Sequence, residues 1–167
     1  MNLLEKAKGM LPKMPEDVFN IWIRPLIESN GWPFESIHSL HSNRNWFQYF
    51  GGNSIQTISN LVWHSQQIPL LGSRLHPNSQ QIINWIILSY VHGRPTPVTK
   101  IKNGKGRESF LRSRQFIKST GRLHTPLVLL EDSLGYHILD GNHRFAACVS
   151  LRPTPLFTVD AWIACRI

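Results

Sequence analysis

The most informative stretch of the chain is HILDGNHRFAA, residues 137–147. Its apolar beginning predicts a strand that ends at Asp140, and its Asn-His-Arg segment predicts the first turn of an apolar helix that continues over residues 145–151. Gly141 between them allows a tight turn and a close approach of a ligand to the backbone. Because the backbone N–H groups at a helix start are free and carry partial positive charge, this stretch predicts an anion site.

The side chains of the same stretch suit phosphate chemistry. Arg144 can bind a phosphate through two parallel hydrogen bonds, and His143 can donate a hydrogen bond or carry a proton. Asp140 has three open roles: a ligand for a metal ion such as Mg²⁺, an orienting partner for Arg144, or a general base. Each residue also has a structural alternative, since Asp140 can cap the helix while His143 and Arg144 lie in solvent.

The residues around this stretch predict alternating strands and helices. Apolar runs bounded by turn residues indicate the strands, and apolar side chains seven residues apart indicate a helix face. The predicted order is a strand at 98–101, a glycine-rich basic turn at 103–106, a helix at 108–119, strands at 126–130 and 136–139 joined by a hairpin turn, and a last strand at 154–163.

Positive charge is concentrated in the second half of the chain. The 167 residues carry 18 Lys and Arg against 10 Asp and Glu, a formal net charge of +8. Residues 1–90 hold six basic and five acidic residues, whereas residues 91–167 hold twelve and five, a net charge of +7. Nine basic residues and only one acid, Glu108, lie between Arg94 and Arg122. This distribution predicts a phosphate-binding surface, with a solvated basic face as the alternative.

The first part of the chain, residues 1–93, predicts a mostly helical region rich in tryptophan. Pro15 followed by two acids is typical of a helix start, and His76 precedes a predicted helix over residues 79–91. The aromatic side chains could stack on nucleic-acid bases, but their helical spacing is more typical of a core. We expect this region either to pack on the second domain, residues 94–167, or to form a subdomain of its own.

Composition excludes several classes of protein. The longest nearly apolar run, residues 82–91, is about half of what a membrane-spanning helix needs. No long apolar segment follows the charged start of the chain, so a secretory signal is not expected. Two cysteines, Cys148 and Cys165, are too few for a disulfide framework or a four-ligand zinc site. The expectation is a reduced, cytoplasmic protein without a membrane partner.

The order of these elements over residues 97–163, together with the loop at 139–147, resembles the ParB/sulfiredoxin superfamily. The resemblance implies an α+β domain with a small mixed sheet, and a nucleotide or DNA phosphate held by residues 140–144. Members include CTP-binding partition proteins, ATP-binding sulfiredoxins and free-serine kinases with an Asp-Gly-x-His-Arg loop. Asn142 occupies the position of the sulfiredoxin cysteine, and Cys148 is displaced from it, so sulfiredoxin chemistry is not expected.

The function implied by this resemblance is that of a nucleoside-triphosphate-dependent hydrolase or phosphotransferase that uses ATP or CTP with Mg²⁺. Asp140 is the candidate Mg²⁺ ligand. The side chains predicted to act in catalysis are Asp140, His143 and Glu108. The residues predicted to hold the phosphates are Gly141, Asn142, His143, Arg144, Lys105, Arg107 and Arg112.

Two alternatives are open. The basic stretch 94–122 could hold DNA, either for binding alone or for metal-dependent cleavage. Asp140 and Glu108 are the only clear acidic candidates, and a two-metal nuclease site would need more. The other alternative is a non-enzymatic regulatory inhibitor of the plasmid or phage type, in which the helical half docks a protein partner.

Overall fold

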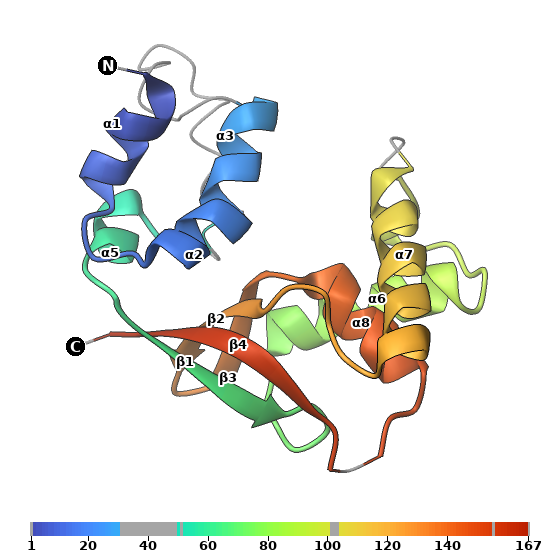
Figure 1. The fold of residues 1–167 in the computed structure, drawn as a ribbon. Coiled ribbons are helices and arrows are strands. Elements are labelled where there is room, and N and C mark those ends of the chain that lie inside the picture. Colours follow the sequence, from blue (N-terminus) through green and yellow to red (C-terminus); the bar gives the residue numbers. More distant parts are fainter. Residues whose placement is uncertain (1, 31–49, 51, 101–103, 155, 167) are drawn as a thin grey trace.

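A computed structural model of the protein describes residues 2–30, 50, 52–100, 104–154 and 156–166 (Figure 1). Within these residues the fold is α+β, as predicted: helices cover both faces of a four-stranded sheet. The strand order is β1-β4-β2-β3. The first strand therefore lies beside the last one, so the sheet joins segments from the first and the second half of the chain.

Both kinds of strand pairing occur, so the sheet is mixed. β1 (Val62–Pro69) pairs antiparallel with β4 (Thr158–Cys165) over eight residue pairs. β4 runs parallel to β2 (Leu127–Asp132), and β2 forms an antiparallel hairpin with β3 (Gly135–Asp140). Helix α8 (Asn142–Ser150) leads from β3 towards β4, which enters the sheet beside β2.

The strand β2 separates two apolar cores. Its side chains alternate, because successive residues of a strand point to opposite faces of the sheet. Val128 and Leu130 belong to the core under the N-terminal helices, whereas Leu127 and Leu129 belong to the core on the other face. All four side chains are at most 2% exposed, which explains why this segment is a continuous apolar run in the sequence.

Short helices near the N-terminus build the first core. Its central aromatic side chain, Trp22, packs edge-on against Phe50 with 5.6 Å between ring centroids. The helix start predicted at Pro15 is confirmed, because Pro15 is the N-cap of the second helix. The helices are α1 (Leu3–Met10), α2 (Glu16–Val18), the π-helical segment η1 (Phe19–Ile23), α3 (Arg24–Asn30) and α5 (Ile55–Ser59).

Three longer helices cover the second core: α6 (Pro77–Tyr90), α7 (Lys105–Thr120) and α8. The predicted helix at 79–91 is α6, which begins two residues earlier, with His76 as its N-cap. The Nδ1 of His76 accepts a hydrogen bond from the backbone N–H of Asn78 at 3.2 Å. The apolar face predicted for α7 is confirmed, since Phe110 and Ile117 are buried. The helix predicted over residues 145–151 is α8, with Asn-His-Arg in its first turn.

Three local predictions are corrected. Residues 98–100, predicted as strand, belong to the 3₁₀ helix η2 (Pro97–Lys100), whose proline fixes a helical φ and has no N–H to donate to a sheet. Lys105 and Gly106, predicted as a turn, already belong to α7. β1 lies in the region predicted to be mostly helical, and α6 packs against α8, so residues before 94 contribute to both cores.

Some residues named by the sequence patterns, in the predicted strand, the basic turn and the set of tryptophans, lie outside the described ranges. Ile101 and Asn103 lie outside the described residues, as do Trp32 and Trp46. Among the residues that the structure describes, no helix combines the length and the apolar character needed to cross a bilayer.

Candidate functional site

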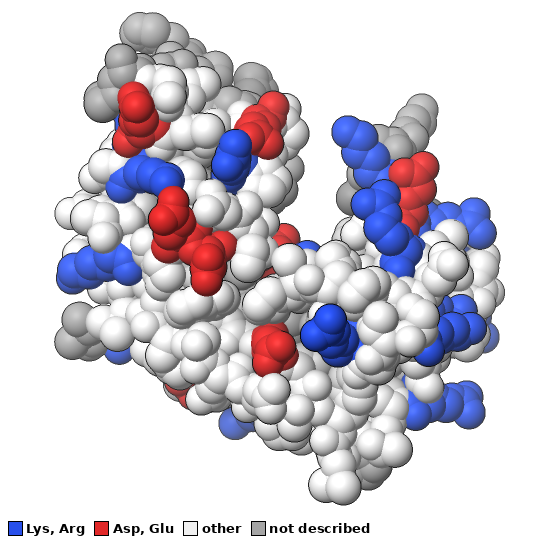
Figure 2. Space-filling view, in the orientation of Figure 1, with Lys and Arg blue, Asp and Glu red and all other residues white. Residues whose placement is uncertain are grey.

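A cavity of about 410 Å³ opens between the N-terminal helices, α6, the start of α7 and the loop from β3 to α8. It belongs to the hollow that separates the N-terminal helices from α7 in the space-filling view (Figure 2). One end of its lining is polar and is formed by residues 104–106 and 140–144. The other end is apolar and includes Trp22, Leu26 and Ile82. Segments that are far apart in the sequence therefore share one cavity.

The loop that starts α8 has a backbone that only glycine can adopt comfortably. Gly141 is the N-cap residue with φ of 106°, and no side chain caps this helix. A Cβ at this position would lie 2.6 Å from Leu127 Cδ2 and 3.1 Å from Arg144 Nη2. The backbone N–H groups of the first helical turn, residues 142–144, therefore remain available at the cavity, which is the geometry of an anion site.

Asp140, the last residue of β3, and Arg144, in the first turn of α8, form an ion pair. Arg144 Nη2 donates a hydrogen bond to Asp140 Oδ2 at 2.7 Å and another to the backbone carbonyl of Pro126 at 3.1 Å. The side chain of Arg144 is only 13% exposed, and that of Asp140 is 32% exposed. Of the predicted roles of Asp140, the structure shows the orientation of Arg144. The helix cap is Gly141, so the N-cap alternative for Asp140 is wrong.

Two polar atoms of the same turn are buried and have no hydrogen-bond partner among the described residues. They are the side-chain oxygen of Asn142 and the Nε of Arg144. One is an acceptor and the other a donor. Buried polar atoms in folded proteins nearly always have a partner, so the orphan atoms mark this turn as incomplete without a ligand or ordered water.

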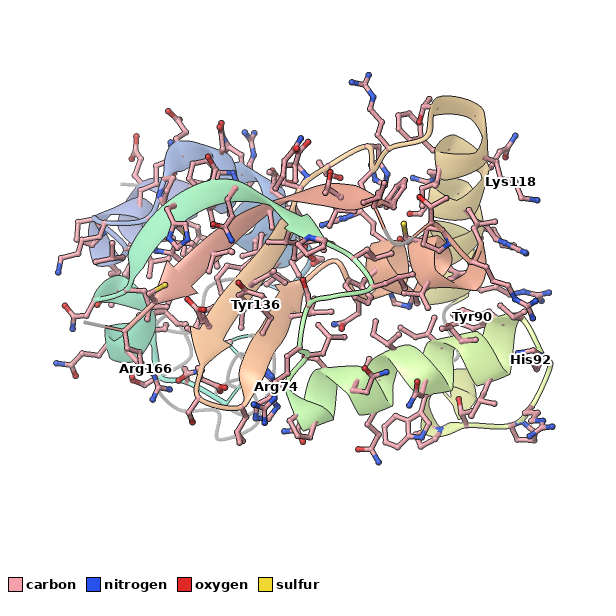
Figure 3. All side chains as sticks on the ribbon, turned by 90° about the horizontal axis from the view of Figure 1, so that it is seen from below. Arg74, Tyr90, His92, Lys118, Tyr136 and Arg166 are labelled. Atoms are coloured by element: carbon pink, nitrogen blue, oxygen red, sulfur yellow. The ribbon has the colours of Figure 1, made fainter. Side chains whose placement is uncertain are left out.

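The start of α7 faces the start of α8 across His143. Gly104, the N-cap of α7, has φ of 64°, and no side chain caps this helix either. A Cβ at Gly106 would lie 2.8 Å from His143 Nε2 and 3.0 Å from the hydroxyl of Tyr90, so glycine makes room for both groups. The rings of Tyr90 and His143 are nearly parallel, with 18° between their planes and 6.1 Å between centroids. Tyr90 reaches this contact from the last turn of α6 (Figure 3).

The pKa of His143 is lowered, which favours the neutral form of its imidazole. Burial lowers its pKa; Arg144 lowers it further, and the opposing effect of Asp140 does not restore it. Burial also raises the pKa of the Tyr90 hydroxyl, although Arg107 opposes that shift. At neutral pH both groups are therefore uncharged, and His143 can accept a proton.

The structure brings together only part of the predicted site. The whole of residues 140–144 lines the cavity together with Lys105. Arg107, Glu108 and Arg112 do not line it and are exposed on α7. Helical spacing separates only Arg107, which lies on the face opposite to Lys105. Glu108 and Arg112 follow Lys105 by three and seven residues and share its side of the helix, so the sequence does not distinguish them from the residues that line the cavity.

Several residues that line the cavity were not predicted. Ser109 lies one turn after Lys105, and Tyr90 ends α6. Trp22 and Leu26 come from the N-terminal helices, and their four-residue spacing has the same appearance as a core face. The sequence contains no local signal that separates a core face from a cavity wall, because both are apolar and follow the helical period.

Asp140 is the only carboxylate that lines the cavity among the described residues. In this part of the chain no group of three or more His, Cys, Asp and Glu side chains is arranged to hold a metal ion. Mg²⁺ is commonly bound by one or two carboxylates together with phosphates of the substrate. A single carboxylate fits such an ion only if the ligand brings most of the oxygen atoms.

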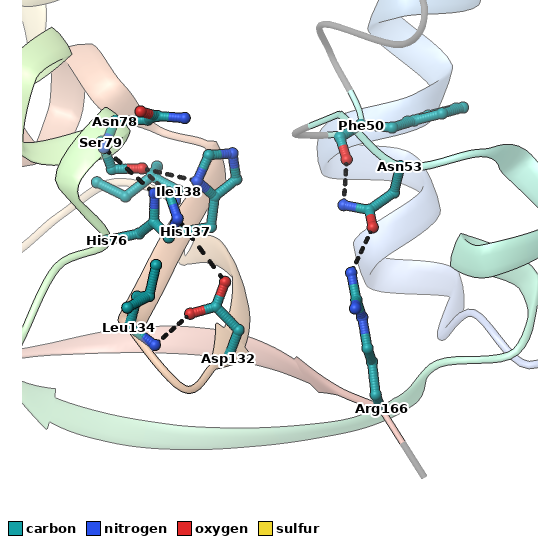
Figure 4. A network of polar contacts seen from close by, with 10 residues as sticks. All are labelled: Phe50, Asn53, His76, Asn78, Ser79, Asp132, Leu134, His137, Ile138 and Arg166. Carbon is teal, nitrogen blue, oxygen red and sulfur yellow. Dashed lines mark hydrogen bonds and ion pairs between the residues drawn. The ribbon is translucent and has the colours of Figure 1, made fainter.

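A second polar cluster joins the β2–β3 hairpin to the start of α6 and does not line the cavity (Figure 4). The rings of His76 and His137 meet edge-on, with 4.8 Å between centroids. His76 Nε2 lies 3.9 Å from Asp132 Oδ2, and the Ser79 hydroxyl lies 3.4 Å from His137 Nδ1. Burial and the neighbouring His76 lower the pKa of His137, against the opposing effect of Asp132. This cluster fixes the hairpin on α6.

Comparisons of the chain with protein-family models, with curated proteins and with solved structures found no match. The functional argument therefore depends on the geometry of the cavity.

Proposed function

We propose that the cavity binds the phosphate chain of a nucleoside triphosphate and that the protein is an NTP-dependent hydrolase or phosphotransferase. The observation that carries the proposal is the meeting of two helix starts without side-chain caps, those of α7 and α8, at one cavity. Each start offers backbone N–H groups and a partial positive charge. The resemblance to the ParB/sulfiredoxin superfamily supports the same class of ligand.

Lys105 and Arg144 have different roles in the proposed phosphate binding. Lys105 is exposed at the cavity and supplies a mobile positive charge for a phosphate. Arg144 is already paired with Asp140, so it is held in one position before a ligand arrives. Because the guanidinium is already fixed, less conformational entropy is lost when a ligand binds. The polar end is therefore suited to several adjoining phosphate groups.

Phosphoryl transfer depends mainly on positioning and charge neutralisation, and both can be supplied here. The neutral imidazole of His143 is placed to accept a proton from an attacking water or hydroxyl group. Mg²⁺ would supply further neutralisation of the phosphate oxygens, with Asp140 as the protein ligand. Glu108 has no part in this proposal, because it lies outside the cavity.

Titration calorimetry with ATP, CTP, GTP and UTP, with and without Mg²⁺, tests the proposal. Replacement of Lys105 by Gln is expected to weaken binding about tenfold, because one charge-assisted contact to phosphate is lost. Lys118→Gln is the matched control, since Lys118 is an exposed lysine in the last turn of the same helix. Absence of binding of every nucleotide at millimolar concentration would refute the proposal.

A second candidate is DNA binding by the outer surface of α7. Arg107, Arg112 and Lys118 are exposed there and do not line the cavity. We propose binding to the DNA backbone, since exposed Lys and Arg side chains neutralise its phosphates. Arg112→Gln should then weaken duplex binding and flatten its salt dependence without changing ATP affinity. Binding of neither DNA nor nucleotide would favour the regulatory alternative with a protein partner.

A further inference from the structure

We infer that the N-terminal helices bind the nucleoside part of the ligand and determine which phosphate compound is accepted, with Trp22 and Leu26 as the selecting residues. This inference rests on the proposed function, because it assigns the apolar end of the same cavity. It also gives a role to the helical region, which lies outside the resemblance over residues 97–163.

The cavity is larger and more apolar than phosphate groups alone require. Its volume of about 410 Å³ lies in the range of sites for small organic ligands. Phosphates need the polar end only. The remaining lining includes Trp22 and Leu26 of the N-terminal helices and Ile82 and Ile86 of α6. A flat heterocyclic base is the part of a nucleotide that gains from such a wall.

Trp22 adds an observation independent of the apolar character of the wall. Its side chain is 2% exposed, and its indole N–H has no hydrogen-bond partner among the described residues. The contacts of its ring with Phe50 at 5.6 Å and Trp63 at 6.3 Å fix the ring and offer no nitrogen or oxygen acceptor. An indole N–H can only donate, so the atom that would satisfy it is an acceptor.

Three residues that line the cavity each hold a buried polar atom without a partner among the described residues. Trp22 provides a donor from the N-terminal helices, while Asn142 and Arg144 provide an acceptor and a donor from the first turn of α8. A nucleoside has ring nitrogens, carbonyl groups and ribose hydroxyls, which together offer acceptors and donors along its length. The arrangement therefore matches a phosphate chain joined to a nucleoside.

The charge of the N-terminal helices agrees with this division. Residues 2–30 contain four acidic and four basic residues, so they add no net attraction for phosphate. Their contribution to the cavity is contact area and one donor. Affinity for phosphate and selection of the attached group thus come from different parts of the chain.

Comparison of ATP with inorganic tripolyphosphate on the full-length protein tests the inference by calorimetry. In the wild type, ATP is expected to bind at least about tenfold more tightly than tripolyphosphate, because the apolar wall adds contact. Leu26→Ala and Trp22→Phe should each weaken ATP about three- to tenfold and leave the affinity for tripolyphosphate unchanged. Ile21→Ala is the matched control, since Ile21 is partly buried in the same helical segment but does not line the cavity.

The outcomes separate the inference from the proposed function. Equal affinity for ATP and tripolyphosphate would overturn the inference and leave phosphate binding in place. Failure of both compounds to bind would overturn the proposed function. Unchanged tripolyphosphate binding by the variants shows that they are folded, so loss of ATP affinity in Ile21→Ala as large as in Leu26→Ala would also contradict the assigned wall.

Discussion

The N-terminal helices and the α7–α8 region line the same cavity but differ in net charge and in how their helices start. Residues 2–30 are electrically balanced; α1 starts at the side-chain cap Asn2, and α2 starts at Pro15, which provides no side-chain cap. Residues 105–122 contain six basic residues against one acid, and both α7 and α8 start without a side-chain cap. The N-terminal helices contribute apolar lining and a buried indole N–H without a partner among the described residues, whereas α7 and α8 contribute helix starts without side-chain caps.

The largest expected effect is on the loop that opens α8. Gly141→Ala should lower the free energy of unfolding by about 2–4 kcal/mol, because its Cβ would contact Leu127 Cδ2 and the backbone has positive φ. Chemical denaturation measures this change. Gly9→Ala in α1 is the control from the other region: no atom lies within 4 Å of its added Cβ, and we expect it to be neutral or stabilising. Equal stability of the two variants would contradict the claim that the loop is tightly constrained.

The next effect compares two ion pairs of the same sequence spacing. Asp140–Arg144 joins at 2.7 Å and Arg24–Glu28 at 2.9 Å, but the side chains are 32% and 13% exposed in the first and 51% and 57% in the second. Asp140→Asn should cost about 1–3 kcal/mol, less than for a fully buried pair because Asp140 is partly exposed. Glu28→Gln should cost less than about 0.5 kcal/mol.

Denaturation of both variants in low and high salt sharpens this comparison. Salt should reduce the already small contribution of the Glu28 pair and change that of the Asp140 pair less, because buried charges are screened less. A cost for Glu28→Gln equal to that for Asp140→Asn would show that burial does not distinguish the two regions.

The smallest effect is expected in the His76–His137 cluster (Figure 4). The pKa of His137 is lowered in the folded protein, so the unfolded chain binds more protons as the pH falls below about 6.5. The contribution of His137 to the free energy of unfolding is therefore complete above the pKa that it has in the unfolded chain. This contribution decreases as the pH falls towards the lower pKa that His137 has in the folded protein. Protonation of His137 would place a positive charge beside His76 and only partly within reach of Asp132.

Thermal unfolding between pH 5 and pH 8 measures this dependence. His137→Gln should reduce the loss of stability at low pH, whereas His64→Gln, which replaces an exposed histidine of β1, should leave it unchanged. An identical pH profile for wild type and His137→Gln would remove His137 from the explanation.

The sequence was most informative where local pattern decides structure. The β2–β3 hairpin, α7 and α8 follow from apolar period and turn residues, and the first turn of α8 follows from Asp-Gly at the end of a strand. β1 escaped prediction because only its seventh residue, Ile68, is buried and the other positions are mostly polar and exposed. Its strand conformation depends on pairing with β4, more than 90 residues later in the chain.

For the site, local sequence predicts the strand, glycine and helix start at residues 140–144, which we propose to bind an anion, and it shows the accumulation of positive charge in the second half. Those features are local, since they depend on residue type and on the order of strand, glycine and helix. Tertiary structure alone decided that Lys105 reaches the cavity while Arg107, Glu108 and Arg112 do not, and that Trp22 and Leu26 form its opposite wall. The reason is that helix rotation and the packing of distant segments fix these positions, and neither leaves a local trace in the sequence.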